Sequence, residues 1–541
     1  MRGLVAAVLP ALLIAAPHEA AAQAEAGKKV YDKHCAQCHG EKGDGQGPAA
    51  PNLLPRPRDF TTGKFKLRTT PSGALPTDDD LKRVVRLGMP YTSMPPWPSL
   101  SDADVDAVVQ YLKTFHDGFA DPAQAPKPIS LPKAPASSKE TVEKGKELYV
   151  SLGCVRCHGE AGRGEGPSAP TLVDDAGTPI KAADLTRRWT FRGGPTREDV
   201  FRTFSTGVNG TPMPSFFDSV SEPDRWALTD YVYSLGDADL PHYATLLVAH
   251  PLEDEVDAAK GEALFEGAPS ARFPVVGQIM EPGRAFAPSA NAVEVRAVYD
   301  AQRIAFEVRW HDNRADTQAT NAPTLEVPPA EEELALKPAQ AGAETDIWGE
   351  PQAQAAAPGA AAGGDFWGEA APADAAASGP AAEFSDAVAI QWPATPPEGV
   401  TKPYFLFGDA QKPVDLWFLD LAGQRVRQFN GRGSAGLTPI EGAEVTGQGS
   451  YAGGAWSAVF VRALRSTSGA SFAEGQYLPV AFSVWDGTSR ERGNRRGLTQ
   501  WFYVYLPPRE KPSAAVPMAK AAGTVLLLEL LVVAGLRRKR S

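Results

Sequence analysis

Two stretches of this chain carry the same pattern, KHCAQCHGEKGDGQGPAAPNL at 33–53 and LGCVRCHGEAGRGEGPSAPTL at 152–172. Each contains a Cys-x-x-Cys-His string, and these strings hold all four cysteines of the chain. The register of the repeat is 119 residues, and it continues far beyond the strings, since Met94-Pro95 recurs as Met213-Pro214. The sequence therefore predicts two copies of one domain.

Cys-x-x-Cys-His is the attachment signature of a c-type haem. Two thiols three residues apart reach both vinyl groups of one porphyrin, and the next residue places an imidazole under the iron. A thioether in the other axial position raises the reduction potential, and a methionine stands 55 residues after the histidine of each string. The predicted covalent attachment residues are Cys35, Cys38, Cys154 and Cys157, and the predicted axial ligands are His39, Met94, His158 and Met213.

A redox disulfide and half of a zinc site are the alternative interpretations of a Cys-x-x-Cys pair. Zinc would need further ligands, and His18, His116, His242, His250 and His311 show no paired spacing. A competitor for the first axial position is Met89. Its repeat partner is Val208, however, so we interpret Met89 as a packing or loop residue.

Residues 25–118 and 141–237 resemble class I cytochrome c domains on the strength of these strings and methionines. The resemblance implies a small helical fold, in which an N-terminal helix ends at the haem motif and a C-terminal helix crosses it. Ser101 and Ser221, each followed by acids, independently indicate the start of that last helix. Between the domains, residues 119–140 are rich in Pro and Ala, which predicts an extended tether between separately folded bodies.

The two ends of the chain indicate its compartment. Residues 1–24 combine an early arginine, a short apolar stretch and small residues for cleavage, as in a secretory signal peptide. A transmembrane anchor there is the alternative, but the apolar run breaks at Pro17. Residues 516–536 form a second apolar run, followed by four basic residues, which favours a C-terminal membrane anchor over a buried terminal helix. The predicted location is the periplasmic side of the bacterial cytoplasmic membrane.

The third region, residues 250–510, changes from helical to alternating apolar spacing, which predicts an antiparallel β-sandwich-like domain. A hairpin is expected from residues 293–310. Within the domain, residues 328–383 are biased to Ala, Pro and Gly, and we predict a disordered insert there. The remaining strands are expected at 387–392, 414–419, 456–461, 478–485 and 501–506.

Three strings in this region, Asp386–Pro393, Pro403–Asp409 and Val480–Gly487, resemble the ethylbenzene dehydrogenase-type haem-binding domain. The resemblance implies the electron-transfer subunit of a periplasmic molybdenum enzyme, with haem b held between a methionine and a lysine. At those two positions this chain has Phe407 and Arg495-Arg496. Phenylalanine has no ligand atom and arginine stays protonated. We therefore expect a docking scaffold without haem b.

The length and net charge of the chain exclude some classes of protein. The 541 residues need more than one core, and 54 basic against 65 acidic residues give a net charge of −11. No basic excess is available to neutralise phosphates, which argues against nucleic-acid binding. An iron with His and Met both bound has no open position, so it exchanges electrons.

The sequence therefore predicts a membrane-anchored dihaem c-type cytochrome with no catalytic residue. It would pass electrons between a redox protein donor and an acceptor, which are respiratory or molybdenum-enzyme partners. A dihaem redox enzyme of the peroxidase or thiosulfate-oxidising type is one alternative. A docking or assembly subunit of a respiratory complex is the other.

Overall fold

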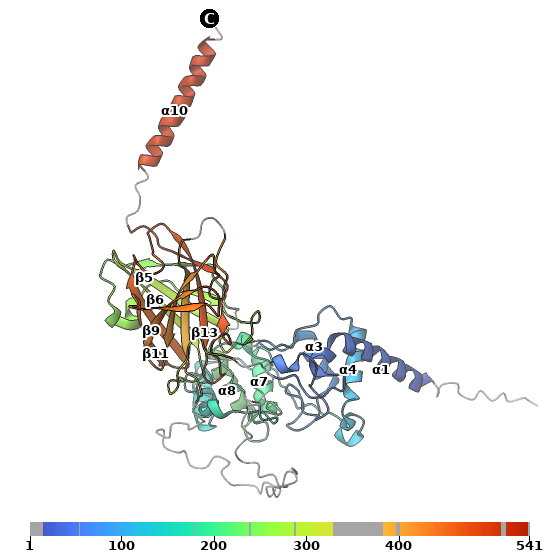
Figure 1. Ribbon diagram of the computed structural model, residues 1–541. Coiled ribbons are helices and arrows are strands. Elements are labelled where there is room, and N and C mark those ends of the chain that lie inside the picture. The colour runs from blue at the N-terminus through green and yellow to red at the C-terminus, as the bar shows by residue number, and fades with distance from the viewer. Residues whose placement is uncertain are drawn as a thin grey trace, which may run out of the picture.

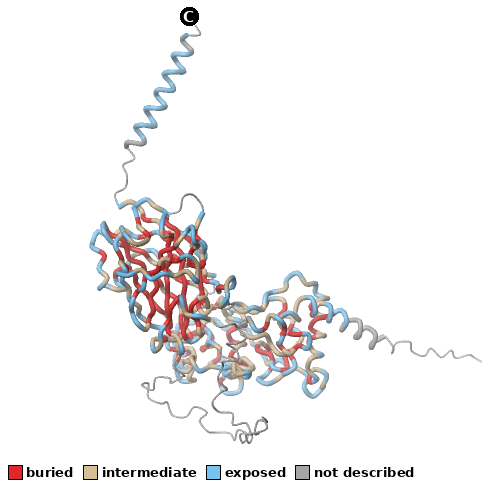
Figure 2. Tube along the Cα trace, in the orientation of Figure 1, coloured by how far each residue is buried: buried red, intermediate tan, exposed pale blue. Residues whose placement is uncertain are grey.

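The computed structural model shows a helical N-terminal part, a β domain and a projecting C-terminal helix (Figure 1). Buried residues are concentrated in the β domain (Figure 2). Residues 1–14 of the predicted signal peptide and 328–381 of the predicted insert lie outside the described residues. The structure describes residues 15–53, 55–178, 180–236, 240–285, 288–327, 382–396, 401–509 and 515–538.

Both haem-motif domains have the expected pair of crossing helices, and serine caps begin the last helix of each. The Ser101 side chain accepts from the N–H of Asp104, and Ser221 does the same from Asp224, which satisfies an N–H group that the helix leaves free. The first domain has α1 (Ala15–His34), α2 (Ala36–His39), α3 (Asp78–Leu87) and α4 (Asp102–Lys113). The second has α5 (Lys139–Ser151), α6 (Val155–His158), α7 (Arg197–Thr206) and α8 (Glu222–Ser234). The 3-10 helices are η1 (Ala50–Asn52), η2 (Asp117–Phe119), η3 (Pro122–Gln124), η4 (Ala169–Thr171), η5 (Arg188–Thr190) and, in the β domain, η6 (Ala258–Phe265).

The two helical domains touch, so the segment between them does not hold them apart as an extended tether would. Arg83 on α3 pairs with Asp199 on α7 at 2.6 Å. Arg68 donates from Nη2 to the carbonyl of Thr206, also at 2.6 Å. The linker itself returns to the first domain, where the N–H of Ile129 donates to the carbonyl of Thr69. Each domain keeps its own hydrophobic core, whereas the ion pair and hydrogen bond that join the two could not be predicted from the composition of the linker.

The β domain contains two sheets. In the nine-stranded sheet the order is β1-β15-β13-β7-β8-β9-β10, with β14 beside β13 and β4 beside β14. In the six-stranded sheet it is β11-β12-β6-β5-β2, with β3 on β5. The strands are β1 (Leu246–Val248), β2 (His250–Pro251), β3 (Ala271–Pro274), β4 (Val276–Gly277), β5 (Ala292–Tyr299), β6 (Arg303–His311), β7 (Ala387–Pro393), β8 (Val414–Asp420), β9 (Arg425–Gly431), β10 (Leu437–Ile440), β11 (Thr446–Ala452), β12 (Ala455–Ala463), β13 (Tyr477–Trp485), β14 (Gly497–Leu498) and β15 (Phe502–Tyr505).

One hydrophobic core joins the two sheets, as in a sandwich. It takes Phe306 from β6 and Phe460 from β12 on one side, and Trp417 from β8 and Phe482 from β13 on the other. The predicted hairpin is confirmed, since β5 and β6 pair antiparallel with Ala297 opposite Phe306. The sheets are not wholly antiparallel, however, because the two short entering strands, β1 and β2, pair parallel with β15 and β5.

The C-terminal helix α10 (Ala515–Arg538) projects away from the β domain (Figure 1). Its 18-residue window Met518–Gly535 has a mean hydropathy of 1.8, and none of that window is buried in the protein. An exposed apolar helix of this length matches the thickness of a bilayer core. By length and composition, α10 is a candidate membrane span at the place where the sequence predicts the anchor.

Candidate haem sites

The first Cys-x-x-Cys-His string lies at the junction of α1 and α2. The thiols of Cys35 and Cys38 are half-buried and form no disulfide. The buried Tyr31 on α1 donates its hydroxyl to the carbonyl of Gly40 at 2.7 Å, which ties the helix to the residue after the motif. The second domain repeats this arrangement with Tyr149 and Gly159, again at 2.7 Å. Thiols held against a helix end fit thioether attachment.

Each motif histidine is oriented by a backbone carbonyl. Nδ1 of His39 lies 3.0 Å from the carbonyl oxygen of Arg58, and Nδ1 of His158 lies 3.0 Å from that of Ala183. A carbonyl can only accept, so Nδ1 carries the hydrogen and Nε2 keeps its lone pair. Burial also lowers the pKa of both histidines, which favours the neutral imidazole. Both side chains are therefore prepared to bind a metal through Nε2.

Both predicted methionine ligands lie in loops with the same hydrogen bonds. The N–H of Met89 donates to the carbonyl of Met94 at 3.0 Å, and the N–H of Val208 donates to that of Met213 at 3.2 Å. Met89 thus contributes backbone to the loop in the same way as its repeat partner, Val208. Both Met94 and Met213 are half-buried.

A glycine before each loop allows this close return of the chain. Gly88 has φ 65° and Gly207 has φ 70°, values that favour glycine. A Cβ atom on Gly88 would lie 2.7 Å from the carbonyl oxygen of Met94, and one on Gly207 would lie 2.7 Å from the amide nitrogen of Ser215. The glycines that recur with the 119-residue repeat are therefore needed to position the methionine segments.

Core packing brings the second motif and its methionine to one cluster. Cys154 and Met213 both pack against the buried cluster that includes Phe204 and Leu228. In the first domain, Cys35 packs on the equivalent core, and the His39 ring stacks on Phe60 with centroids 4.5 Å apart. Apolar side chains therefore lie against Cys35 and His39 in the first domain and against Cys154 and Met213 in the second, whereas Met94 is not among the residues that pack on the first core.

Arg58 lies between the two sites, and no sequence signal marks it, because its structural counterpart is Ala183, which does not follow the 119-residue register. Its carbonyl orients His39 of the first domain. Its guanidinium lies 3.3 Å from the position of a Cβ on Gly210, in the loop that leads to Met213. The histidine side of the first site therefore adjoins the methionine side of the second.

The β domain has a different arrangement at the two positions expected for haem b ligands. Phe407 and Arg496 are both fully buried, and the guanidinium carbon of Arg496 lies 3.9 Å above the Phe407 ring. Burial lowers the pKa of Arg496 to about 9, and its Nη1 donates to the carbonyl of Gly493. The two side chains pack directly on each other and neither can ligate iron.

Family models match both helical domains. Residues 22–112 match the model for cytochrome c oxidase, cbb3-type, subunit III, and residues 142–236 match the model for cytochrome c. The chain therefore contains two cytochrome c-type domains, as the resemblance implied.

Relatives of known name extend this finding. A putative respiratory nitrate reductase heme subunit of Haloferax mediterranei is 31% identical over 133 residues, which cover 24% of this chain and 46% of that protein. Dimethylsulfide dehydrogenase subunit gamma of Rhodovulum sulfidophilum is 29% identical over 119 residues, covering 20% and 44%. This chain spans less than half the length of either relative. Among solved structures, a chain of the Kuenenia stuttgartiensis reducing HAO-like protein complex is 45% identical with a TM-score of 0.38, covering 39% of this chain and 96% of that one.

Proposed function

We propose that this chain is a periplasmic, membrane-anchored dihaem c-type cytochrome that passes electrons between redox partners and has no catalytic residue. The observation that carries the proposal is the repeated site: free thiols, a histidine with Nε2 available, and a methionine loop closed by the same backbone bond. A site filled on both axial positions suits electron exchange rather than substrate binding.

The residues that would hold the two haems are those of the repeat. Two cysteines of each motif form the thioether bonds, and the motif histidine and the later methionine bind the iron, namely Cys35, Cys38, His39 and Met94 in the first domain and Cys154, Cys157, His158 and Met213 in the second. When bound, a c-type haem supplies one-electron exchange. The protein orients the imidazoles and excludes water around them.

The contacts between domains favour exchange within the chain. Arg58 adjoins both sites, so the first haem domain packs its histidine side on the methionine loop of the second. The second domain in turn packs its histidine-side loop on the β domain, where Lys181 pairs with Asp486 at 2.8 Å. Three bodies therefore follow one another in a line, with α10 as the predicted anchor on the last.

The partners we propose are respiratory oxidoreductases. The names of the relatives, a nitrate reductase heme subunit and a dimethylsulfide dehydrogenase subunit, support an electron-transfer subunit of such a complex. The resemblance of the β domain points to a molybdenum enzyme as one partner and to a docking role for this domain. The net charge of −11 favours partners with a basic face.

Haem counting and ligand replacement test the proposal together. Pyridine haemochrome analysis with acid–acetone extraction of the full chain should find two covalent haems and no extractable one. Met94→Ala and Met213→Ala should each lower the midpoint potential of one centre, because the thioether raises it. Met89→Ala is the matched control and should leave both potentials unchanged. A potential that responds to Met89→Ala and not to Met94→Ala would contradict the assignment, and peroxide turnover by the wild-type chain would favour the enzyme alternative.

A further inference from the structure

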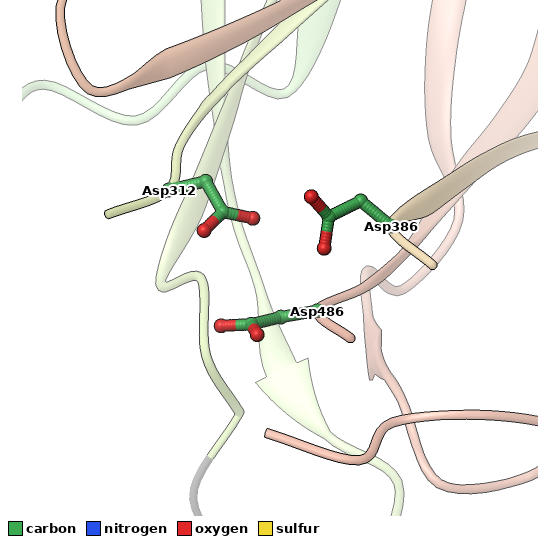
Figure 3. Close-up of side chains that lie close together, drawn as sticks. All are labelled: Asp312, Asp386 and Asp486. Carbon is green, nitrogen blue, oxygen red and sulfur yellow. The ribbon is translucent and has the colours of Figure 1, made fainter. Parts of the chain in front are cut away.

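Three aspartates from separate strands meet at one end of the β sandwich (Figure 3). Asp312 follows β6, Asp386 precedes β7 and Asp486 follows β13. All three are buried, with 4%, 0% and 2% of each residue exposed. One carboxylate oxygen of each lies within 4.8 Å of the others.

Asp312 leaves one carboxylate oxygen without a donor. Its Oδ1 accepts from the N–H of Arg314 at 3.2 Å, whereas its buried Oδ2 has no hydrogen-bond partner. Figure 3 shows this carboxylate turned toward those of Asp386 and Asp486. A buried, charged oxygen without a partner costs several kcal/mol unless a ligand satisfies it.

The other two aspartates are held in place by donors from their surroundings. Asp386 accepts from the N–H of Gly487 at 2.8 Å and from Nε1 of Trp456 at 2.9 Å. Asp486 accepts from the N–H of Ser489 and from Nζ of Lys181, both at 2.8 Å. The backbone therefore positions both carboxylates before any ligand arrives.

Charge in the cluster does not balance. With all three carboxylates ionised, Lys181 as their one cation would leave two negative charges. Nearby, Asp316 is paired with Arg314 at 2.8 Å. The buried Glu491 faces Asp486, whose N–H donates to it at 3.0 Å. Burial, together with repulsion from Asp386 and Asp486, raises the pKa of Asp312 well above its usual range.

The ligand set and its spacing select a hard divalent ion. Carboxylate oxygens without nitrogen or sulfur donors are the ligands of Ca²⁺ and Mg²⁺ rather than of zinc or copper. Oxygens bound at about 2.4 Å on opposite sides of a Ca²⁺ ion are about 4.8 Å apart, which is the limit within which these three lie. We propose that Asp312, Asp386 and Asp486 bind one Ca²⁺ ion, with Lys181 balancing the remaining charge.

The position of this site gives the ion a structural role. Lys181 belongs to the second cytochrome domain, and beside the cluster His311 donates from Nε2 to the carbonyl of Arg163 at 2.7 Å. Arg163 also donates from Nη1 to the carbonyl of Gly453 at 2.9 Å. The ion therefore lies where the second cytochrome domain meets the β domain, and it would fix the orientation of one on the other.

The test uses the haem-loaded full chain in detergent, freed of metal with EGTA and titrated with CaCl₂. Wild type should bind one Ca²⁺ per chain, and its thermal unfolding temperature should rise with Ca²⁺. Asp312→Asn should lower the affinity by more than about tenfold and abolish the rise. Asp254→Asn, at an exposed position of the same domain, is the matched control and should behave as wild type.

The relative stability of wild type and Asp312→Asn is an independent test of the proposal. Without Ca²⁺, Asp312→Asn removes a repelled buried charge, so the variant should unfold above wild type. With saturating Ca²⁺ the order should invert. If wild type takes up no Ca²⁺ and Asp312→Asn is the more stable chain at every Ca²⁺ concentration, Lys181 alone serves the cluster and the proposal fails.

Discussion

Gly145 on α5 lies where α8 crosses it, and a methyl group there has no space. A Cβ on this residue would lie 2.7 Å from the carbonyl carbon of Ala227 and 2.7 Å from Cβ of Tyr231. Carbon atoms in contact need about 3.5 Å or more. Since both neighbours are backbone or Cβ atoms, no rotamer change relieves the overlap, and the helices must move apart.

Two opposing effects set how far Gly145→Ala changes the free energy of unfolding. Alanine is a better helix former than glycine by about 1 kcal/mol, whereas overpacking a tight contact costs about 1–3 kcal/mol. The upper end applies here because the clash involves backbone. We therefore expect a net loss of about 2 kcal/mol. The shift would also disturb Tyr149, one turn further along α5, which packs on Tyr231 with centroids 5.2 Å apart.

Calorimetric unfolding of the full chain measures this effect as a lower transition temperature for the second cytochrome domain. Lys146→Ala is the control, because Lys146 is the next residue on the same helix and is exposed. Gly27→Ala should have the matching effect in the first domain, where the added Cβ would lie 2.9 Å from Cβ of Tyr111. If Gly145→Ala is as stable as wild type, or gains the stability that propensity alone predicts, the close-crossing argument is refuted.

Three further predictions concern the β domain and the contact between the cytochrome domains. Burial acts against the charge of Asp300, but three backbone N–H donors and Arg303 outweigh it and hold its pKa below the usual range. The ionised Asp300 therefore adds to the free energy of unfolding above that pH range, and this contribution is lost as the pH falls through the lowered pKa. Asp300→Asn should cost about 1–3 kcal/mol at neutral pH. A cost that persists in strong acid would contradict this. Phe407→Met with Arg496→Lys should create extractable haem b, and haem b already present in wild type would disprove the loss of ligands. Arg83→Gln should cost at most about 1 kcal/mol in a double-mutant cycle with Asp199, because Arg83 is 41% exposed; a larger coupling would show that the pair holds the domains together.

Much of the fold could be predicted because it depends on short-range sequence patterns. The Ser101 and Ser221 caps and the β5–β6 hairpin depend on neighbours a few residues apart. Strand β11, with the sequence TGQGSYA, was missed because glycine and polar residues replace the apolar alternation. The short parallel strands β1 and β2 were missed because two or three residues carry no period.

The sequence by itself determined the two Cys-x-x-Cys-His motifs and the equal spacing of the methionines that we predict as ligands, because attachment chemistry depends on residue types at set spacings. Tertiary structure alone decided which long-range groups meet. Arg58 reaches both sites, Phe407 packs on Arg496, and Lys181 enters the aspartate cluster of a different domain. Most of these contacts join residues far apart in the chain, such as Phe407 with Arg496 and Lys181 with Asp486. Periodic patterns in the sequence do not predict these contacts. They depend on which loops folding brings together and on the balance of charge that burial then requires.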